Sequence, residues 1–381
     1  MPHENSVFHA MVKLVAWDAF EDAIAQHDVA GQARRFTWKN HLVALLYGQF
    51  AGASSLRDIT DGMHSHANRL YHLGSRPAHR SSLADANRDR SVAPFCDLLS
   101  AMIQRAHRGL RRNMDGATYL IDSTSLALNK RSDGWARFSA DAAGVKTHVI
   151  YDADADCPIY AAVSTANVND ITPAKTMPVE KGATYVFDLG YYDYAWWASL
   201  DAAGCRIVTR LKRNTPLSVI ETRATPGGAI LSDQIGYLPA RLSSQRRNPF
   251  HKPVRELQVR IDTGKVLRIV TNDLAAPAQD IADLYKRRWA IEPFFRWIKQ
   301  TLKISRFLGT SENAVRIQIA VALIAFVLLR LAQKTQKTIK SPPTFARLVR
   351  ANLMHLRRLD HLQCPPKRPI GLPLTGQGVL I

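Results

Sequence analysis

The sequence predicts an α/β protein in which a purely helical region comes first and strands mixed with helices follow. Three observations support this fold class. Residues 1–113 read as helices without strand-like alternation, and hydrophobic strand-like segments follow between residues 117 and 214. A β-rich stretch at 215–271 then separates these segments from a strongly amphipathic helix at 281–302. The α/β core is therefore expected to be interrupted by a β-rich insertion.

Composition limits the partners of this protein. The chain has 381 residues, of which 46% are hydrophobic, so it is long enough for a sizeable core and for two or three domains. Its formal net charge of +19 favours a polyanionic partner, and nucleic acid is the first candidate. A basic ribosomal or membrane-surface protein would carry the same charge, so the charge alone does not identify the partner as DNA.

Cysteine usage and hydropathy favour a cytoplasmic protein. The cysteines are scattered without metal-ligand spacing, as expected of reduced thiols: Cys96, Cys157, Cys205 and Cys364. The N-terminal residues lack a basic start followed by an apolar core, so no signal peptide is expected. The apolar run 319–329 is well short of the roughly 20 residues that a spanning helix needs. It predicts a buried core helix and no membrane partner.

The region from residue 1 to 113 is predicted to be a helical N-terminal DNA-binding domain. Ser55 with Asp58, and Ser82 with Asp85, have the spacing of capping boxes that begin helices. Short helices joined by tight turns are compatible with helix-turn-helix DNA reading. Basic side chains around the last turn favour phosphate contact: Arg76, Arg80, Arg88 and Arg90. A helical scaffold or dimerisation unit fits the same pattern.

Strand-like segments after residue 117 end on acidic and basic side chains. The segment ATYLID ends at Asp122 and ATYVFD ends at Asp188, while CRIVTRLKRN carries Arg210 and Lys212 at its end. Two more strand candidates, at 144–154 and 158–170, lie between the two aspartates. Three hairpin-like strands, then a strand, a helix and another strand, resemble a ribonuclease H-like core. We expect this core over residues 114–334, around the insertion at 215–271.

The segment 281–302, IADLYKRRWAIEPFFRWIKQTL, reads as one amphipathic helix. Four polar side chains fall on one arc of about 60°, opposite the apolar pattern: Tyr285, Arg288, Glu292 and Lys299. A carboxylate among a phenol and two cations suits work on a phosphodiester, because it can hold a metal while the cations grip phosphates. A solvated face with ordinary charge pairs would contain the same residues. Pro293 is expected to kink the helix near Trp289 unless a second helix starts there.

The gaps between these four residues resemble the Tyr-Arg-Glu-Lys signature of insertion-sequence transposases of the insertion sequence four family, in the DDE superfamily. The resemblance implies cut-and-paste transposition of an insertion element between DNA sites. It implies a catalytic, metal-binding triad of Asp122, Asp188 and Glu292, whose carboxyl groups should converge. It also implies contacts to DNA phosphates, to which we add the strand-end cations: Tyr285, Arg288, Lys299, Arg210 and Lys212.

The resemblance also implies cofactors and partners. Two Mg²⁺ ions about 3.5–4 Å apart would serve the chemistry, with Mn²⁺ as a substitute, because Mg²⁺ prefers hard oxygen ligands. The expected partners are double-stranded DNA, as terminal inverted repeats and as target, and a second copy of the chain in a synaptic homodimer. The expected location is the cytoplasm, in association with the nucleoid.

Three questions stay open at the level of sequence. Relatives stack an extruded base on a tryptophan in the insertion, yet none occurs between Trp197 and Trp289, and Tyr237 and Phe250 are the aromatic candidates there. The basic C-terminal tail, 335–381, fits either a phosphate-binding arm or a solubilising tail. The alternatives in function are a catalytically inactive protein that binds terminal repeats, or another ribonuclease H-like nuclease.

Overall fold

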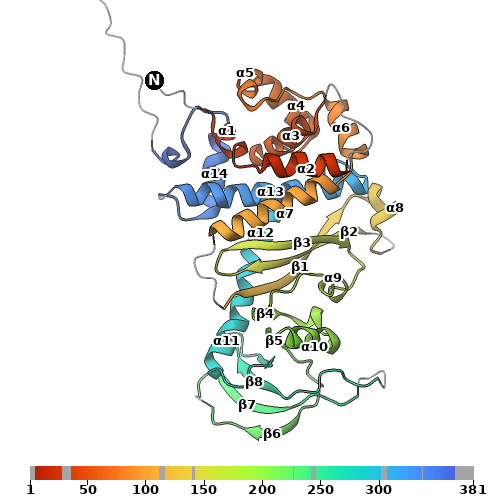
Figure 1. Cartoon of the computed structure of the whole chain (residues 1–381), viewed down its shortest axis with the longest axis vertical. Helices are drawn as coiled ribbons and strands as arrows, with labels where there is room; N and C mark the ends of the chain where they lie inside the picture. The colour runs from red at the N-terminus through yellow and green to blue at the C-terminus, as the bar shows by residue number, and fades with distance from the viewer. Residues whose placement is uncertain are drawn as a thin grey trace, which may run out of the picture.

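The structure is a computed structural model, and it describes residues 5–27, 36–110, 116–139, 142–225, 227–241, 246–301, 307–336 and 338–364. Its long axis runs from a helical end, through a sheet, to a strand-rich end formed by the insertion (Figure 1). The helical end contains both N-terminal and C-terminal segments, so residues far apart in the sequence pack side by side.

The N-terminal region is helical, as the sequence predicts. Its helices are α1 (Val7–Val12), α2 (Trp17–His27), α3 (Trp38–Ala51), α4 (Leu56–Ser65), α5 (Ala67–Leu70), α6 (Arg80–Asp89) and α7 (Ala93–Leu110), with a 3₁₀ turn η1 (Tyr71–Leu73). The capping box of Ser55 and Asp58 at the start of α4 is confirmed. The one predicted for Ser82 is wrong, because His79 is the extended N-cap residue of α6 and its carbonyl accepts a hydrogen bond from the Leu83 amide at 3.0 Å. Ser82 therefore lies inside the first turn.

Helix α13 (Glu312–Thr335) connects the C-terminal part of the chain to this helical end. It packs against α3, α7 and α14 (Pro342–Ala351). It is long and apolar enough to cross a membrane, but 83% of its most apolar stretch is buried inside the protein. The predicted buried core helix at 319–329 is thus confirmed. Helix α14 folds part of the predicted basic tail, and residues 365–381 of that tail lie outside the described residues.

The predicted strands of the core are β1 (Thr118–Leu128), β2 (Ala143–Asp152), β3 (Cys157–Thr165), β4 (Thr184–Phe187) and β5 (Arg206–Arg210). They are neighbours in the order β3-β2-β1-β4-β5, with β1 antiparallel to β2 and parallel to β4, and β4 parallel to β5. Strand β1 continues past Asp122, where the sequence predicts its end, because its pairing with β2 runs on to Leu128 and Ala143.

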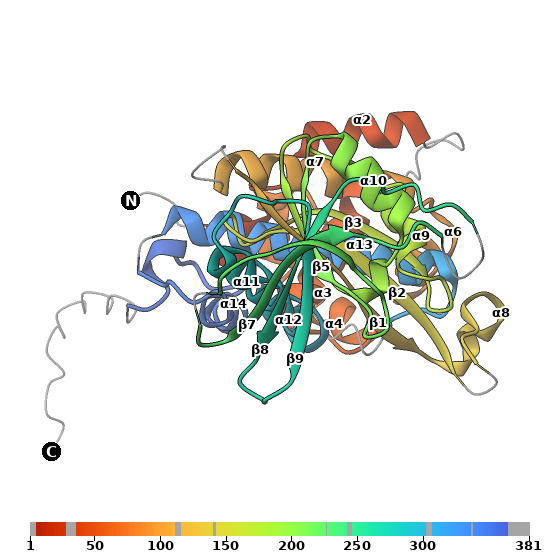
Figure 2. The ribbon, with the colours of Figure 1, turned by 90° about the horizontal axis from the view of Figure 1, so that it is seen from below.

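The insertion adds four strands to this same sheet within the described residues. These are β6 (Ser218–Thr222), β7 (Ile230–Tyr237), β8 (Val254–Arg260) and β9 (Val266–Thr271), all antiparallel to their neighbours, and β9 pairs with β5. Seen from below, the strands fan out around a common centre, as in a twisted sheet (Figure 2). Arg255 of β8 joins Asp233 of β7 in a buried ion pair at 2.6 Å.

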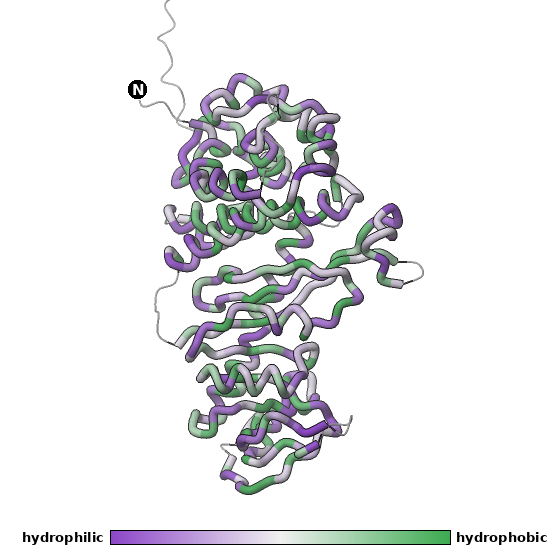
Figure 3. Tube along the Cα trace, turned by 45° about the vertical axis from the view of Figure 1, so that its right-hand side comes forward, coloured by the Kyte–Doolittle hydropathy of each residue, from purple (hydrophilic) through white to green (hydrophobic). Residues whose placement is uncertain are grey.

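Both faces of the central strands are covered. Leu120, Val186 and Val208 belong to a large core shared with the helical end and with α11 and α12, described below. The alternating residues, such as Ile121 and Phe187, belong to a second core beneath α10 (Tyr194–Ala202). Hydrophobic stretches follow these central strands and the helices packed on them (Figure 3). Short elements complete the fold: α8 (Asp133–Ala136), α9 (Ile171–Ala174), η2 (Lys130–Ser132), η3 (Leu189–Tyr191) and η5 (Leu359–His361).

The predicted helix 281–302 is broken in two. Helix α11 (Ala278–Arg287) passes through a 3₁₀ turn, η4 (Arg288–Ala290), into α12 (Ile291–Thr301). The break lies near Trp289, where Pro293 predicts it, and the proline sits in the first turn of α12, where a missing amide donor costs least. The break separates the environments of the signature residues, since Tyr285 and Arg288 are buried while Glu292 is exposed.

Candidate active site

Two aspartates lie on neighbouring parallel strands, just past the point where β1 and β4 stop pairing. Ile121 of β1 lies opposite Phe187 of β4 in the last parallel pair, so Asp122 and Asp188 come next on adjacent strands. Side chains alternate between the faces of a strand, so the Asp122 side chain lies on the face of Leu120, over which α11 and α12 pack. The two aspartates that the sequence predicts therefore lie next to each other in the sheet, although Asp122 is inside β1 and not at its end.

Asp122 is bound on both oxygens. Its Oδ2 accepts a hydrogen bond from Nη1 of Arg288 at 2.8 Å, and its Oδ1 accepts one from the Ser123 amide at 2.8 Å. Burial, helped by the nearby carboxylates of Asp188 and Asp170, raises the pKa of Asp122 to about 6, although Arg288 and the hydrogen bond from the Ser123 amide lower it. The site is thus already crowded with negative charge that one guanidinium offsets only in part.

Arg288 is held in η4 by aromatic rings and by its ion pair. Its guanidinium carbon lies 5.8 Å from the ring centre of Tyr285 and 5.1 Å from that of Trp289. The residue is 8% exposed, and its Nε atom has no hydrogen-bond partner in the described part of the chain. One donor of the guanidinium fork is therefore still available to an incoming acceptor.

Tyr285 and Arg210 form the neighbouring part of the site. Burial raises the pKa of Tyr285, while the charges of Arg288 and Arg210 lower it. Among the described residues, neither the Tyr285 hydroxyl nor Nε of Arg210 has a hydrogen-bond partner, although both atoms are buried. Buried polar atoms without partners are rare in folded proteins and call for an explanation such as an absent ligand.

Asp170, which its sequence context indicates is a structural turn residue, lies beside the two aspartates. Its Oδ1 accepts hydrogen bonds from Oγ of Ser123 at 2.9 Å and from Nζ of Lys146 at 3.2 Å. A Cβ atom added to Gly190 would lie 3.0 Å from Oδ2 of Asp170 and 3.2 Å from Oδ1 of Asp188, so both carboxylates border this glycine. The only local signal is an acid after a strand, in NVND, which is more typical of a turn.

The remaining predicted residues make no hydrogen bond or ion pair with this group in the part of the chain that the structure describes. Glu292 is exposed in the first turn of α12, and Lys299 is exposed in its last turn. Lys212 lies 4.6 Å above the ring of Tyr192, beyond the end of β5. Within the described residues no three acidic, histidine or cysteine side chains are grouped to hold a metal ion. The triad of Asp122, Asp188 and Glu292 therefore stays a prediction.

The chemistry of the aspartate pair suits a hard divalent cation. Carboxylate oxygens are the ligands that Mg²⁺ prefers, and Asp122 and Asp188 follow the last paired residues of adjacent strands. The half-buried Asp122 makes an ion pair with Arg288, which a bound cation would have to share or replace. The two aspartates would hold the ion.

Comparison with known proteins matches the predicted core region to one protein family. Residues 114–328 match the family described as the transposase DDE domain, and residues 3–76 match a domain of unknown function. The protein y4zB of Sinorhizobium fredii, which carries a transposase name, is 39% identical over 298 residues, covering 77% of this chain and 81% of that protein.

Two further similarities extend this comparison. A Geobacillus stearothermophilus protein, named as a transposase for insertion sequence element IS5377, is 32% identical over 256 residues, or 66% of this chain and 67% of its own length. The piggyBac transposase, in a synaptic complex with hairpin DNA, aligns with a TM-score of 0.46 and 11% identity over 94% of this chain and 82% of its own.

Proposed function

The chain belongs to the insertion-sequence transposases of the DDE superfamily, and we propose that it cuts an insertion element out of DNA and joins it elsewhere. In this proposal it binds the terminal inverted repeats, cleaves phosphodiester bonds there and transfers the freed ends to target DNA. The agreement of the Tyr-Arg-Glu-Lys spacing with the insertion sequence four family supports this assignment.

The observation that carries the proposal is the meeting of Asp122 and Asp188 beside Arg288. Two carboxylates on adjacent strands offer hard oxygen ligands, and a guanidinium is the side chain best shaped to bind a phosphate through two donors. The order β3-β2-β1-β4-β5, with its parallel and antiparallel neighbours, supports a ribonuclease H-like core around this pair.

Asp122, Asp188 and Glu292 would hold the two Mg²⁺ ions, with Mn²⁺ as a substitute. When bound, such ions activate water or a DNA 3′-hydroxyl and stabilise the leaving oxygen of an in-line displacement. The residues of the chain have a separate task, which is to hold the scissile phosphate. Tyr285, Arg288 and Arg210 each have a buried donor without a partner in the described residues, and these donors would bind the phosphate.

The wider proposal concerns DNA, oligomer and location. Lys299 and Lys212 would contact phosphates at the rim, since both cations are available beyond the buried group. Pairing two element ends requires at least a homodimer in the synaptic complex. We propose a cytoplasmic, nucleoid-associated protein of three parts: a helical DNA-binding domain at 1–113, the core at 114–334 with its insertion at 215–271, and the basic tail at 335–381.

Replacing Glu292 by Gln tests catalysis against binding alone. The substitution keeps the shape of the side chain but removes one metal-binding charge, so Mg²⁺-dependent cleavage of terminal-repeat DNA should fall at least 100-fold, about 3 kcal/mol in barrier. Binding of the same DNA should be unchanged. Cleavage is measured on labelled duplex, and binding by titration without divalent ions.

Asp262→Asn provides a matched control, since Asp262 is an exposed acid in the β8–β9 turn. This variant should cleave like the native chain. Undiminished cleavage by Glu292→Gln would remove Glu292 from the catalytic triad. A native chain that binds terminal repeats but never cleaves them would instead favour the inactive binding protein.

A further inference from the structure

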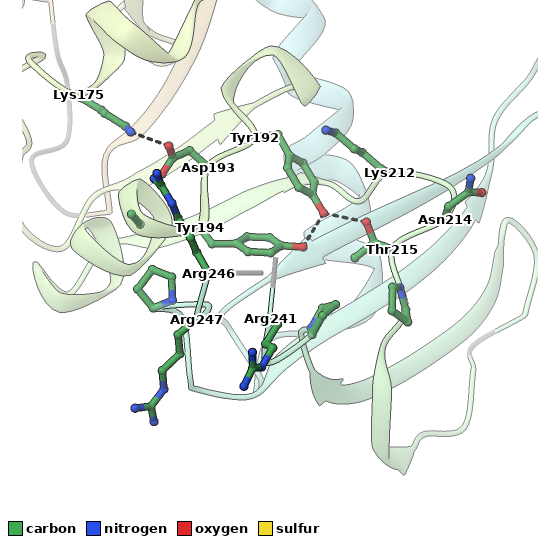
Figure 4. Close-up of a pocket in the computed structure, with 14 residues that line it drawn as sticks. Lys175, Tyr192, Asp193, Tyr194, Lys212, Asn214, Thr215, Arg241, Arg246 and Arg247 are labelled. Atoms are coloured by element: carbon green, nitrogen blue, oxygen red, sulfur yellow. Dashed lines mark hydrogen bonds and ion pairs between the residues drawn. The ribbon is translucent and has the colours of Figure 1, made fainter. Parts of the chain in front are cut away.

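A pocket of ≈ 860 Å³ lies between the start of α10, the loop after β5 and the loop that follows β7 (Figure 4). We propose that this pocket binds the sugar–phosphate backbone of duplex DNA next to the cleavage site. The inference rests on the proposed function, because it names a second DNA contact of the same enzyme.

The pocket borders the candidate active site along two strands. Asp188 follows β4, and the chain then passes through η3 directly to Tyr192 on the pocket wall. Arg210 ends β5, and Lys212 lines the pocket just beyond it. Because β4 and β5 are neighbouring parallel strands, both connections leave the same edge of the sheet. A DNA strand held at the aspartates therefore has a short path to the pocket.

The charge of the pocket is strongly positive. Arg241, Arg246 and Arg247 line it, and none of them has a carboxylate partner in the described part of the chain. Lys175 is neutralised by Asp193 at 2.5 Å. An isolated backbone bridge pairs Arg241 with Arg247, and like charges at paired positions repel each other, so a bound anion would relieve this repulsion.

One wall of the pocket is fixed before any ligand arrives. Arg268 of β9 forms a two-fold ion pair with Glu256, at 2.6 and 2.7 Å. Its Nη1 atom also donates to the carbonyls of Lys212, Arg213 and Thr215, at 3.1, 2.9 and 2.7 Å. The loop that carries Lys212 is thereby held in one conformation, which reduces the entropy lost on binding.

The rings of Tyr192 and Tyr194 line the pocket but are not open for a base to stack on them. The Tyr192 hydroxyl is hydrogen-bonded to that of Tyr194 at 2.7 Å and to Oγ1 of Thr215 at 2.8 Å (Figure 4). Lys212 lies over the Tyr192 ring, and Trp197 packs against the same ring at 5.1 Å. Tyr194 is 7% exposed. With its rings covered, the pocket suits phosphates rather than an unpaired base, which needs an open aromatic face.

The test is a double substitution, Arg241→Ala with Arg247→Ala. Binding of terminal-repeat duplex is measured over a salt series without divalent ions. Each phosphate that the protein no longer binds should reduce the slope of log K against log salt by about 0.9, so the double variant should show a slope lower by roughly two units. The matched control removes two exposed cations of the β8–β9 hairpin, Arg260→Ala with Lys265→Ala, and should keep the native slope.

A melting curve for each variant and a single-stranded version of the DNA complete the experiment. We expect native melting, and a loss of slope that is larger on the duplex than on the single strand. An unchanged slope, or an equal loss in the control pair, overturns the proposal. A loss confined to the single strand also overturns it, in favour of an unpaired strand. A native chain with a pocket-dependent slope but no cleavage leaves this inference standing and refutes the proposed function.

Discussion

At the scale of single residues, the raised pKa of Asp122 makes the free energy of unfolding depend on pH. Its pKa in the folded chain is about 6, above its ordinary value of 3.8, so the folded state binds this proton more tightly than the unfolded state. The contribution to stability is fully present below pH 3.8 and is lost as the pH rises through 6. Over that interval the loss corresponds to about 3 kcal/mol.

Asp122→Asn should therefore stabilise the protein at neutral pH without divalent ions, but by less than the about 3 kcal/mol of the pKa shift, because the amide removes the buried carboxylate charge and also leaves the buried Arg288 with a neutral partner. The gain should disappear near pH 4. Denaturant unfolding across pH 4–8 measures it, with Asp262→Asn as the exposed control. Added Mg²⁺ should stabilise the native chain but not the variant. A variant less stable than the native chain at pH 7.5 would contradict this account.

The sequence singled out Asp122 and Asp188 because each follows a hydrophobic strand-like segment; Asp188 does follow the end of β4, whereas β1 continues past Asp122 to Leu128. The sequence could not predict Asp170, because what makes that acid part of the site is its hydrogen bonds to Ser123 and Lys146 across strands. Nor could spacing show that Arg288 binds Asp122 at 2.8 Å rather than an acid on its own helix. Contacts between distant segments depend on packing that no local pattern encodes.

At the scale of elements, the break at η4 places the residues of the predicted arc in two different environments. Arg288 is buried and pairs with Asp122, whereas Lys299 is exposed on α12. The existence of the β-rich strands was predictable from their alternation and turns. Their place in the sheet was not, since the pairing of β9 with β5 joins residues far apart in the sequence.

The two cations should therefore respond differently to substitution by alanine. Arg288→Ala leaves the Asp122 charge without its partner, so stability should fall by on the order of 3 kcal/mol, together with a salt slope lower by about 0.9. Lys299→Ala should lower the slope by the same amount while stability stays within about 0.5 kcal/mol. Binding to a pre-cleaved end across a salt series, beside a melting curve, measures both effects.

Lys286→Ala, an exposed lysine on α11, serves as the control and should change neither quantity. If Arg288→Ala melts early but keeps the native slope, Arg288 is a structural partner of Asp122 and no DNA ligand. An intact slope in Lys299→Ala would likewise remove Lys299 from the DNA surface.

At the scale of the whole molecule, the helical end and the sheet share one hydrophobic core. Buried residues of α3 and α7, such as Leu42 and Met102, belong to the same cluster as Leu120 of β1 and the length of α13. His107 of α7 also bonds Asp152 of β2 at 3.0 Å. The N-terminal helices thus bury their apolar faces largely against segments that come later in the chain.

The fragment 1–113 should therefore not fold by itself, even though its sequence reads as a separate domain. Without α13, the apolar faces of α3 and α7 would be exposed, and patches beyond a few hundred Å² drive association. We expect aggregation or a broad, non-cooperative melt by circular dichroism. Co-expression with residues 114–381 should restore a soluble complex that melts cooperatively, which serves as the control. A monomeric fragment with a sharp melting transition would show instead that the helical region is an independent domain, and that the core it shares with α13 is an interface between two folded units.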